Sequence, residues 1–321
     1  MTLSNQSSLD LSTFLPPSGF LPSWPEGDET LWGRPTVYRG RPLLLTPRLR
    51  FLAGLALALY QMAQSLAEKV QATNLAFPRS DPMLPQLPRI LDIGCDHGKL
   101  AIFLAAHPDL GEVLGSDLRA QPLARAEANA AHYLGTCPRL HFHQGDGLQG
   151  LDLQPWDIII VAGLGGLEIK KIMEEVHARP SHPPLLWILQ ANTARSALRS
   201  LALDQALPIF REYVKDFSHF FYHYLLLLDP GTNSQLAETL FTSAPDLNSP
   251  APRPGDLLLG PYFEELVASM QETDPHLAGR FFRFHQGILT DQLRGDALNP
   301  DLLAAQKRLE SLDPTMDTER I

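Results

Sequence analysis

The chain has 321 residues, of which 44% are hydrophobic and 19% are charged. This composition supports a sizeable buried core and excludes a chain that is disordered throughout. The net charge of −10 differs from the basic balance typical of nucleic-acid-binding proteins. Two cysteines are too few for a disulfide framework or a zinc ribbon. The longest apolar run, Phe51 to Tyr60, is about half as long as a membrane span, and no secretory signal opens the chain, so we expect a soluble cytoplasmic protein.

The chain changes character twice along its length. Residues 1–45 are rich in proline, serine and glycine, and we expect an extension that is disordered or draped over the main body. Thr46-Pro47 supplies an N-cap and a first-turn proline for a helix that runs to about Gln71. From Arg89 onward, short apolar runs alternate with helical segments, which is typical of a parallel α/β sheet. The expected strands cover residues 89–92, 112–117, 139–144, 156–161 and 185–189, and the expected helices cover 98–107, 120–134, 165–178 and 192–206.

Two longer apolar runs, 208–215 and 219–228, close this alternating region. The few residues between them fit an antiparallel hairpin and are too short for a parallel crossover. Five βα units followed by a hairpin is the order of elements in class I methyltransferases, which have a Rossmann-like α/β sheet of seven strands.

A proline-rich stretch separates this region from a last group of helical patterns at 261–272, 276–294 and 300–312. We therefore expect an extension at 1–45, an α/β domain at 46–229, a linker at 230–256 and a helical module at 257–321.

The strongest site signal lies at the end of the first expected strand. Here Asp92 is followed by Gly94, Cys95 and Gly98, and the glycines allow the backbone to approach a ligand closely. The pattern is not G-x-G-x-x-G, and an acid in front of the first glycine suits an ammonium group better than a pyrophosphate. A bare structural turn is the alternative.

Acids also follow the next two expected strands. Asp117, with Leu118 after it, stands about 20 residues beyond the glycine loop, where an acid accepts both ribose hydroxyls of a nucleoside cofactor. Asp146 and Gly147 follow the third strand, where a carboxylate accepts a hydrogen bond from an adenine amino group. A helix N-cap at Asp117 and a plain turn at Asp146 are the alternatives. Three acids on one sheet edge together form the pattern for S-adenosylmethionine.

The fourth and fifth expected strands end in Val161–Gly166 and Leu189–Asn192. In such a sheet these ends lie next to the reactive methyl, so Ala162 and Gly163 are expected at the cofactor. The glycines leave backbone amides and space for a flat base, and a tight strand-to-helix turn is the alternative. The Asn/Asp-Pro-Pro-Tyr motif of amino-directed methyltransferases is absent from this position.

The ordered motifs resemble those of the bacterial tRNA (adenine-22-N1)-methyltransferase family. They are D-I-G-C-D-H-G at 92–98, G-D-G-L at 145–148, V-A-G-L-G-G at 161–166 and L-Q-A-N at 189–192. Leu45–Leu49 is similar to the family's opening helix, and Gly260–Tyr262 to the start of its helical appendage. Departures are Lys99–Ala101 in place of Tyr-Leu-Pro, Ala191 in place of a proline, and Ser116 where the family often has Glu.

The resemblance implies an S-adenosylmethionine-dependent enzyme that methylates N1 of an adenine in tRNA. We expect Asp96, His97, Gln190 and Asn192 to hold the base edge. Two alternatives stay open: a methyltransferase of this fold that acts on another RNA position or a small molecule, and a non-catalytic module that binds the cofactor.

Basic residues and histidines lead to two further expectations. Arg34, Arg39, Arg41, Arg48 and Arg50 follow one another without an intervening acid, so we expect a tRNA-contacting strip, with solvated arginines as the alternative. The next candidates for tRNA contact are Arg119, Arg125, Arg195 and Arg199. We expect no metal site, because neither His141 with His143 nor His219 with His223 has a supporting carboxylate or cysteine spacing. The oligomeric state is not predicted.

Overall fold

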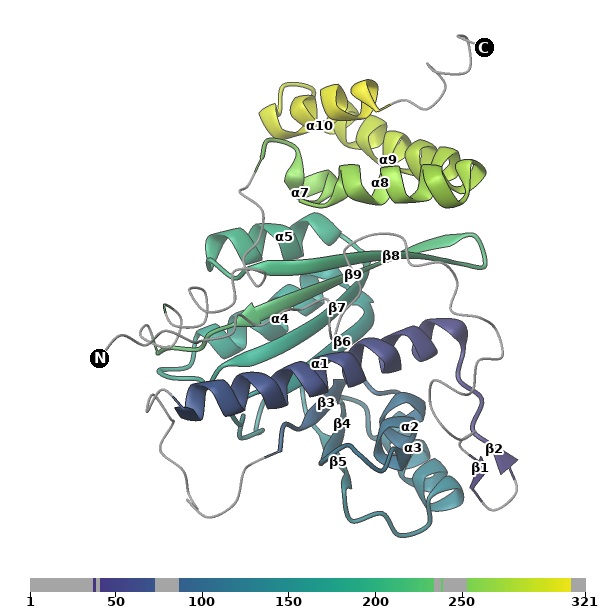
Figure 1. The fold of residues 1–321 in the computed structure, drawn as a ribbon, viewed down its shortest axis with the longest axis vertical. Coiled ribbons are helices and arrows are strands. Elements are labelled where there is room, and N and C mark those ends of the chain that lie inside the picture. The colour runs from purple at the N-terminus through teal and green to yellow at the C-terminus, as the bar shows by residue number, and fades with distance from the viewer. Residues whose placement is uncertain (1–36, 39–40, 73–86, 234–237, 239–252, 313–321) are drawn as a thin grey trace.

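The computed structural model describes residues 37–38, 41–72, 87–233, 238 and 253–312 (Figure 1). Most of the N-terminal extension, the insert and most of the linker lie outside the described residues, so the expected course of residues 1–36 is not addressed by the structure. Just before the main body, β1 (Val37–Tyr38) and β2 (Arg41–Pro42) form a small antiparallel pair.

A seven-stranded sheet forms the centre of the molecule, in the order β5-β4-β3-β6-β7-β9-β8. The strands are β3 (Ile90–Ile93), β4 (Val113–Asp117), β5 (Leu140–Gln144), β6 (Asp157–Gly165), β7 (Leu185–Thr193), β8 (Ile209–Phe217) and β9 (Phe220–Asp229). The first five are parallel, and β9 runs antiparallel to both β7 and β8. This order confirms the predicted class I methyltransferase sheet with its terminal hairpin.

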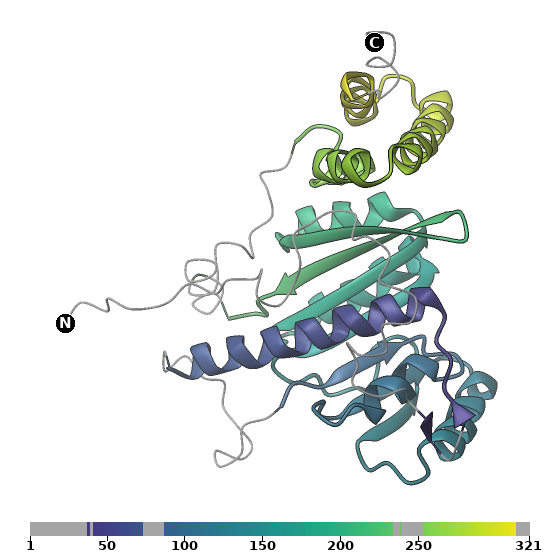
Figure 2. The same ribbon diagram turned by 45° about the vertical axis from the view of Figure 1, so that its right-hand side comes forward.

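Helices cover both faces of the sheet (Figures 1 and 2). One face carries α1 (Pro47–Ala72), α2 (Lys99–Ala106) and α3 (Ala120–Tyr133), and the other carries α4 (Gly166–His177) and α5 (Arg195–Asp204). Successive strand residues serve the two faces alternately: Ile158 and Ile160 join the α1 side, whereas Ile159 and Val161 join the α4 side. Apolar residues at consecutive positions are therefore required, as is usual for a parallel sheet buried on both faces.

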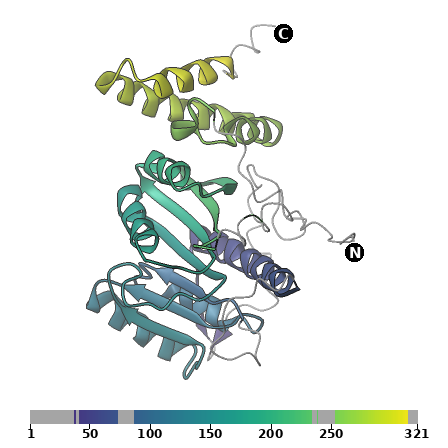
Figure 3. The ribbon, with the colours of Figure 1, turned by 90° about the vertical axis from the view of Figure 1, so that its left-hand side faces the viewer.

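A third core lies beyond the β8 edge of the sheet (Figure 3). It is formed by α7 (Asp256–Leu259), α8 (Phe263–Thr273), α9 (Pro275–Gly295) and α10 (Pro300–Ser311). Val214 and Phe221 of the hairpin belong to the same core, so these helices pack on the sheet. Asn299 caps α10 by accepting hydrogen bonds from the amides of Asp301 (3.0 Å) and Leu302 (3.3 Å), which agrees with the predicted Asn-Pro start.

Two strands extend further than expected. We predicted that β6 would end near Val161 and β7 near Leu189, but they continue to Gly165 and Thr193. Pairing between the two strands persists through shifts of register around Leu164, so the glycine-rich segment stays in the sheet. Among the described residues, no helix is long and apolar enough to cross a membrane.

Candidate functional site

The predicted site residues gather at the carboxyl ends of the parallel strands. The chain leaves the β5 edge and returns to pair β6 with β3, so the strand order reverses between these two neighbours. Ligands of open α/β sheets bind in the crevice at such a switch point. Helix α1 crosses the sheet near this edge (Figure 2), and its first turn supplies a residue to the site.

The glycine loop after β3 is held by the neighbouring strand. The amides of Gly94 and Cys95 donate to the carbonyl oxygen of Ser116 at 2.8 and 2.9 Å. Gly98 has a φ of +70°, and a Cβ there would lie 2.8 Å from the Cβ of Ala126, so only glycine fits. Burial of Cys95 raises the pKa of its thiol well above the usual range, which favours the neutral thiol over the thiolate.

Asp117 at the end of β4 ties the loop to the next helix. Its side chain is 5% exposed; Oδ2 accepts from the amide of Asp96 at 3.1 Å and Oδ1 from that of Arg119 at 2.9 Å. The N-cap of α3 is Arg119, so the alternative of an N-cap at Asp117 is not what the structure shows. A carboxylate has about four acceptor positions, which leaves room for ligand hydroxyls.

Asp92 is the most perturbed acid of the site. It is 6% exposed, and burial raises its pKa to about 7, while the Ala101 amide and the charge of Arg48 oppose this shift. A bound cation would favour the ionised form, because an opposite charge nearby lowers a carboxyl pKa. Asp92 therefore suits the cationic group for which the sequence analysis selected it.

The third acid, Asp146, lies nearer the surface than the other two. Its side chain is 43% exposed and pairs with Lys171 Nζ of α4 at 3.2 Å, a partner that the sequence analysis missed. Gly147 beside it has a φ of +60°, and a Cβ there would lie 3.0 Å from Ile172. On the same edge, the apolar side chain of Leu118 is 61% exposed.

A chain of polar side chains links α1, β7 and β6. Arg48 Nη1 donates to Gln190 Oε1 at 2.8 Å, and Gln190 Nε2 donates to Asn192 Oδ1 at 3.0 Å. Asn192 Nδ2 then donates to the carbonyl oxygen of Gly163 at 2.7 Å. The structure thus brings together two residues that we predicted at the base edge, and it adds Arg48 to them.

Arg48, a member of the expected arginine strip, makes contacts inside the candidate site. Its guanidinium reaches over the sheet edge, 5.9 Å from the ring centre of Tyr222, and a Cβ on Gly163 would lie 2.8 Å from its Nη1. The signal was present in the motif Leu45–Leu49, but charge alone suggested a surface role. Arg50 Nε donates to the Leu45 carbonyl oxygen. Two members of the strip, Arg34 and Arg39, lie outside the described residues.

The prediction that Arg199 is a candidate for tRNA contact is wrong, because the residue is only 2% exposed. Nη1 donates to the Leu258 carbonyl oxygen at 2.9 Å, and Nη2 pairs with Glu212. Position 199 lies on the α5 face that meets α7, so the side chain holds the helical module and is not available to tRNA. Arg195 lies 5.2 Å from the ring centre of Phe284 in the same module.

Asp96 and His97 occupy the outer side of the glycine loop. Their side chains are 57% and 37% exposed, and His97 Nε2 lies 3.7 Å from Asp96 Oδ2. Arg119 Nη2 lies 3.8 Å from the other Asp96 oxygen, and Asn129 Nδ2 donates to the His97 carbonyl oxygen at 3.0 Å. The four predicted base residues therefore form two groups, one on this loop and one at Gln190 and Asn192.

Comparisons with known proteins agree with this architecture. The family model described as "Methyltransferase domain" matches residues 81–225. A protein of Mycoplasma pneumoniae, named "Putative tRNA methyltransferase", is 39% identical over 98 residues, which are 29% of this chain and 43% of that protein. The matched stretch is thus less than half the length of this curated relative.

Two solved structures have a similar fold. One is a Streptococcus pneumoniae protein described as "a putative tRNA (m1A22) methyltransferase, in complex with S-adenosyl-L-methionine"; it is 18% identical, with a TM-score of 0.53 over 84% of this chain and 100% of that chain. The other, a Streptococcus agalactiae protein of the NADB-Rossmann superfamily, is 16% identical, with a TM-score of 0.51 over 78% and 95%. With the strand order and the matched domain, they identify the main body of this chain as a class I methyltransferase fold.

Proposed function

We propose that the protein is an S-adenosylmethionine-dependent methyltransferase that acts on N1 of an adenine in tRNA, at position 22 as in the family it resembles, and that it works in the cytoplasm. The observation that carries this proposal is the meeting of two sets of groups at one sheet edge. The buried carboxylates of Asp92 and Asp117 lie on the glycine-loop side, and the amide groups of Gln190 and Asn192 lie across the switch point. The name of the curated relative supports the choice of tRNA.

The acids fit the three polar parts of S-adenosylmethionine. Asp92, buried and with a pKa near 7, suits the ammonium of the amino-acid moiety. Asp117 keeps acceptor positions for the ribose hydroxyls beside its two backbone amides. Leu118 offers an apolar surface to the adenine ring, and Asp146 an acceptor for its amino group. We assign the surrounding backbone of Gly94, Cys95, Gly98, Gly147, Ala162 and Gly163 to the same cofactor site.

Methyl transfer to adenine N1 requires little acid–base catalysis by the protein. When bound, S-adenosylmethionine supplies an electrophilic methyl group on a positively charged sulfur. Adenine N1 has a free lone pair at neutral pH, so no strong base is needed to activate it. The protein's task is to hold N1 in line with the methyl group, a contribution of proximity and orientation. Because N1 is paired in a duplex, the base also has to turn out of its stack.

The polar chain fixes the orientation of the groups that face the base. Arg48 is a donor only, so the Gln190 amide must present its oxygen to Arg48 and its nitrogen to Asn192. Asn192 in turn directs its nitrogen at the Gly163 carbonyl, and its exposed side chain keeps a free acceptor position on Oδ1. That acceptor suits the exocyclic amino group next to N1. Gln190, fully buried, acts as a positioning residue between Arg48 and Asn192.

The group formed by Asp96 and His97 can stabilise the positive charge that methylation leaves on the base. Asp96 is an exposed carboxylate at the rim of the glycine loop, with His97 and Arg119 as neighbours. A carboxylate aimed at a developing positive charge stabilises the transition state. We therefore assign Asp96 to this role and His97 to the base edge beside it.

A methyltransferase that acts on a small molecule is the second candidate. Two observations favour it: the net charge of −10, and the burial of Arg199, which removes one expected phosphate contact. Incubating the protein with bulk tRNA and radiolabelled S-adenosylmethionine, followed by nucleoside analysis, separates the two. We expect label in 1-methyladenosine. Cofactor binding without label in any tRNA nucleoside would overturn the tRNA assignment and favour the small molecule.

A further inference from the structure

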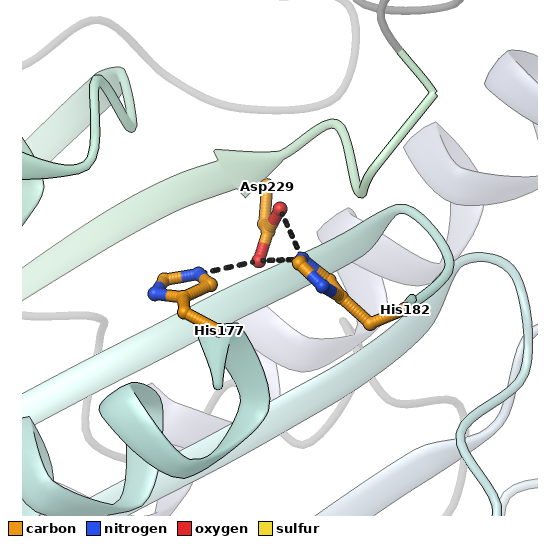
Figure 4. Close-up of side chains that lie close together, drawn as sticks. All are labelled: His177, His182 and Asp229. Atoms are coloured by element: carbon orange, nitrogen blue, oxygen red, sulfur yellow. Dashed lines mark hydrogen bonds and ion pairs between the residues drawn. The ribbon is translucent and has the colours of Figure 1, made fainter. Parts of the chain in front are cut away.

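Three side chains of types that can bind a metal ion lie close together, as Figure 4 shows, at the end of β7 opposite the candidate site. His177 is the last residue of α4, His182 lies in the loop before β7, and Asp229 is the last residue of β9. Asp229 pairs with Leu185 at the start of β7, whereas the methyl-transfer residues lie at the end of that strand. The side chains are 11%, 7% and 2% exposed in chain order, so the cluster is buried.

The two histidines direct the same ring atom at one carboxylate. His177 Nε2 lies 2.9 Å from Asp229 Oδ2, and His182 Nε2 lies 3.1 Å from each oxygen of Asp229. The ligand atoms of all three residues lie within 4.8 Å of one another. In a tetrahedral zinc site with bonds of about 2.0–2.1 Å, neighbouring ligand atoms are about 3.3 Å apart. The two nitrogen–oxygen distances are close to this value, and all three ligand atoms lie near enough for a modest side-chain movement to place them at three corners of a tetrahedron.

We propose that His177, His182 and Asp229 bind a zinc ion, which joins the end of β9 to the end of α4. Two imidazole nitrogens and one carboxylate form a donor set that zinc accepts, whereas magnesium and calcium prefer oxygen ligands. The three ligands come from three segments, so the ion would tie these segments together, and a water molecule would take the fourth coordination position. The site is far from the methyl-transfer residues along β7, so it adds to the proposed function without depending on it.

The local backbone already brings these segments together. The Gly231 amide donates to Asp229 Oδ1 at 2.9 Å, and the Thr232 amide donates to the His182 carbonyl oxygen at 3.1 Å. Gly231 has a φ of +72°, and a Cβ there would lie 2.6 Å from the same oxygen. The chain therefore turns tightly against the His182 loop after β9. The zinc ion would stabilise the packing of this turn against the loop.

A hydrogen-bonded trio is the competing arrangement, and the ring protons distinguish the two. In the trio, each neutral imidazole donates from Nε2, so its Nδ1 lone pair stays bare. With zinc on Nε2, the proton moves to Nδ1. Within the described part of the chain, the Nδ1 atoms of both histidines are buried and have no hydrogen-bond partner, so the group at Nε2 decides which ring nitrogen carries the proton.

The sequence analysis expected no metal and examined other histidines. His177 and His182 lie on two sides of a helix end, and Asp229 comes 47 positions after His182, so no compact spacing motif exists. Of the pairs that were considered, His141 lies 3.3 Å from Glu112 in an exposed pair. This pair has one imidazole and one carboxylate, so His141→Ala is a matched control.

The test uses the full chain, stripped with a chelator and reloaded with zinc. We expect one tightly bound zinc per chain by mass spectrometry and a higher unfolding midpoint after reloading. His182→Ala and Asp229→Ala should lose both effects, and His141→Ala should keep them. Nitrogen NMR of the wild-type protein should show protons on Nδ1 of both ligating histidines.

Three results would overturn the proposal. The first is a zinc content and an unfolding midpoint of the wild type that match those of His182→Ala. The second is protonation of Nε2 in His177 and His182 in the presence of excess zinc. The third is an equal loss of zinc in the His141→Ala control. If a ligand variant fails to fold, the zinc titration and the NMR tautomer of the wild type decide the matter alone. Methyl transfer is measured separately, so its failure would not affect this test.

Discussion

Buried charged groups form two clusters in this molecule, one between the sheet and the helical module and one at the candidate site, and the two differ in how their charges are paired. Between the sheet and the helical module, Arg199 pairs with Glu212 and donates to a backbone carbonyl, and both side chains are at most 3% exposed. His223 Nδ1 lies 3.6 Å from Glu212 Oε1, and its ring lies 5.4 Å from that of His285. At the candidate site, Asp92 is also buried, but among the described residues its charge is favoured only by the Ala101 amide and by the charge of Arg48, with which no ion pair is formed.

This difference in pairing distinguishes charged residues that hold the structure together from charged residues that can bind a ligand. In the interface cluster, a Cβ on Gly260 would lie 2.4 Å from Glu212 Oε2, so backbone closes around the ion pair. At the candidate site, Asp96, Leu118 and Asn192 beside the buried acids are exposed. A buried carboxylate with exposed neighbours can meet a ligand, whereas one enclosed by its own arginine cannot.

The largest expected effect concerns the closed cluster. Glu212→Ala leaves the Arg199 guanidinium buried and unpaired, and such a change costs about 3–5 kcal/mol in the free energy of unfolding. Chemical denaturation of the variant checks this. Asp291→Ala, which breaks the fully surface-located pair with Arg294, is the control and should change stability little. Equal effects of both variants would show that the interface is not closed.

The second effect concerns the cofactor. Asp117→Ala should weaken S-adenosylmethionine binding by about 1.5–3 kcal/mol, the range for hydrogen bonds to a charged group. Isothermal calorimetry measures the affinity. Asp117→Asn, which keeps the size of the side chain, shows whether charge matters. Because Asp117 also holds the Asp96 amide, circular dichroism must show a folded variant; unchanged affinity in a folded Asp117→Ala protein would remove the ribose assignment.

The third effect concerns the base side of the open cluster. Asn192→Ala removes the proposed contact to the adenine amino group and should lower the rate of methyl transfer roughly tenfold, with cofactor affinity unchanged. His97→Ala should behave in the same direction. Single-turnover assays and calorimetry give the two readings. Parallel loss of rate and cofactor affinity would instead assign these residues to the cofactor loop.

A variant of Arg48 tests whether this residue acts through Gln190 or as part of the expected arginine strip. Arg48→Gln should lower transfer through its contact with Gln190, and it should leave the salt dependence of tRNA binding unchanged. Arg50→Gln, which changes an exposed arginine two positions further along the helix, is the matched control for charge. If Arg48 contacts phosphate instead, the plot of log tRNA affinity against log salt concentration should be less steep for Arg48→Gln than for the wild type.

The smallest effect is the pH dependence of the closed cluster. Burial lowers the pKa of His223 and of His285 well below 6.5, and Arg195 and Arg199 act in the same direction. The unfolded chain binds protons near pH 6.5 while the folded chain does not, so stability falls as the pH falls. Between pH 7 and pH 6, this amounts to about 0.7 kcal/mol for each histidine. His285→Gln should remove the contribution of one histidine to this pH dependence, which urea titrations at pH 7 and pH 6 measure. An unchanged pH dependence of the free energy of unfolding would contradict the assignment.

The sequence by itself determined the order of helices and strands, the terminal hairpin and the edge of the sheet that carries the acids. Those features depend on residues close together in the chain: apolar alternation, the short gap between β8 and β9, and the caps at Thr46 and Asn299. Only the tertiary structure decided the partners of individual side chains. Arg48 meets Gln190 across 142 positions, and Asp229 meets His182 across 47. No local pattern records such pairs, because they form only when the packing of the sheet brings distant segments together.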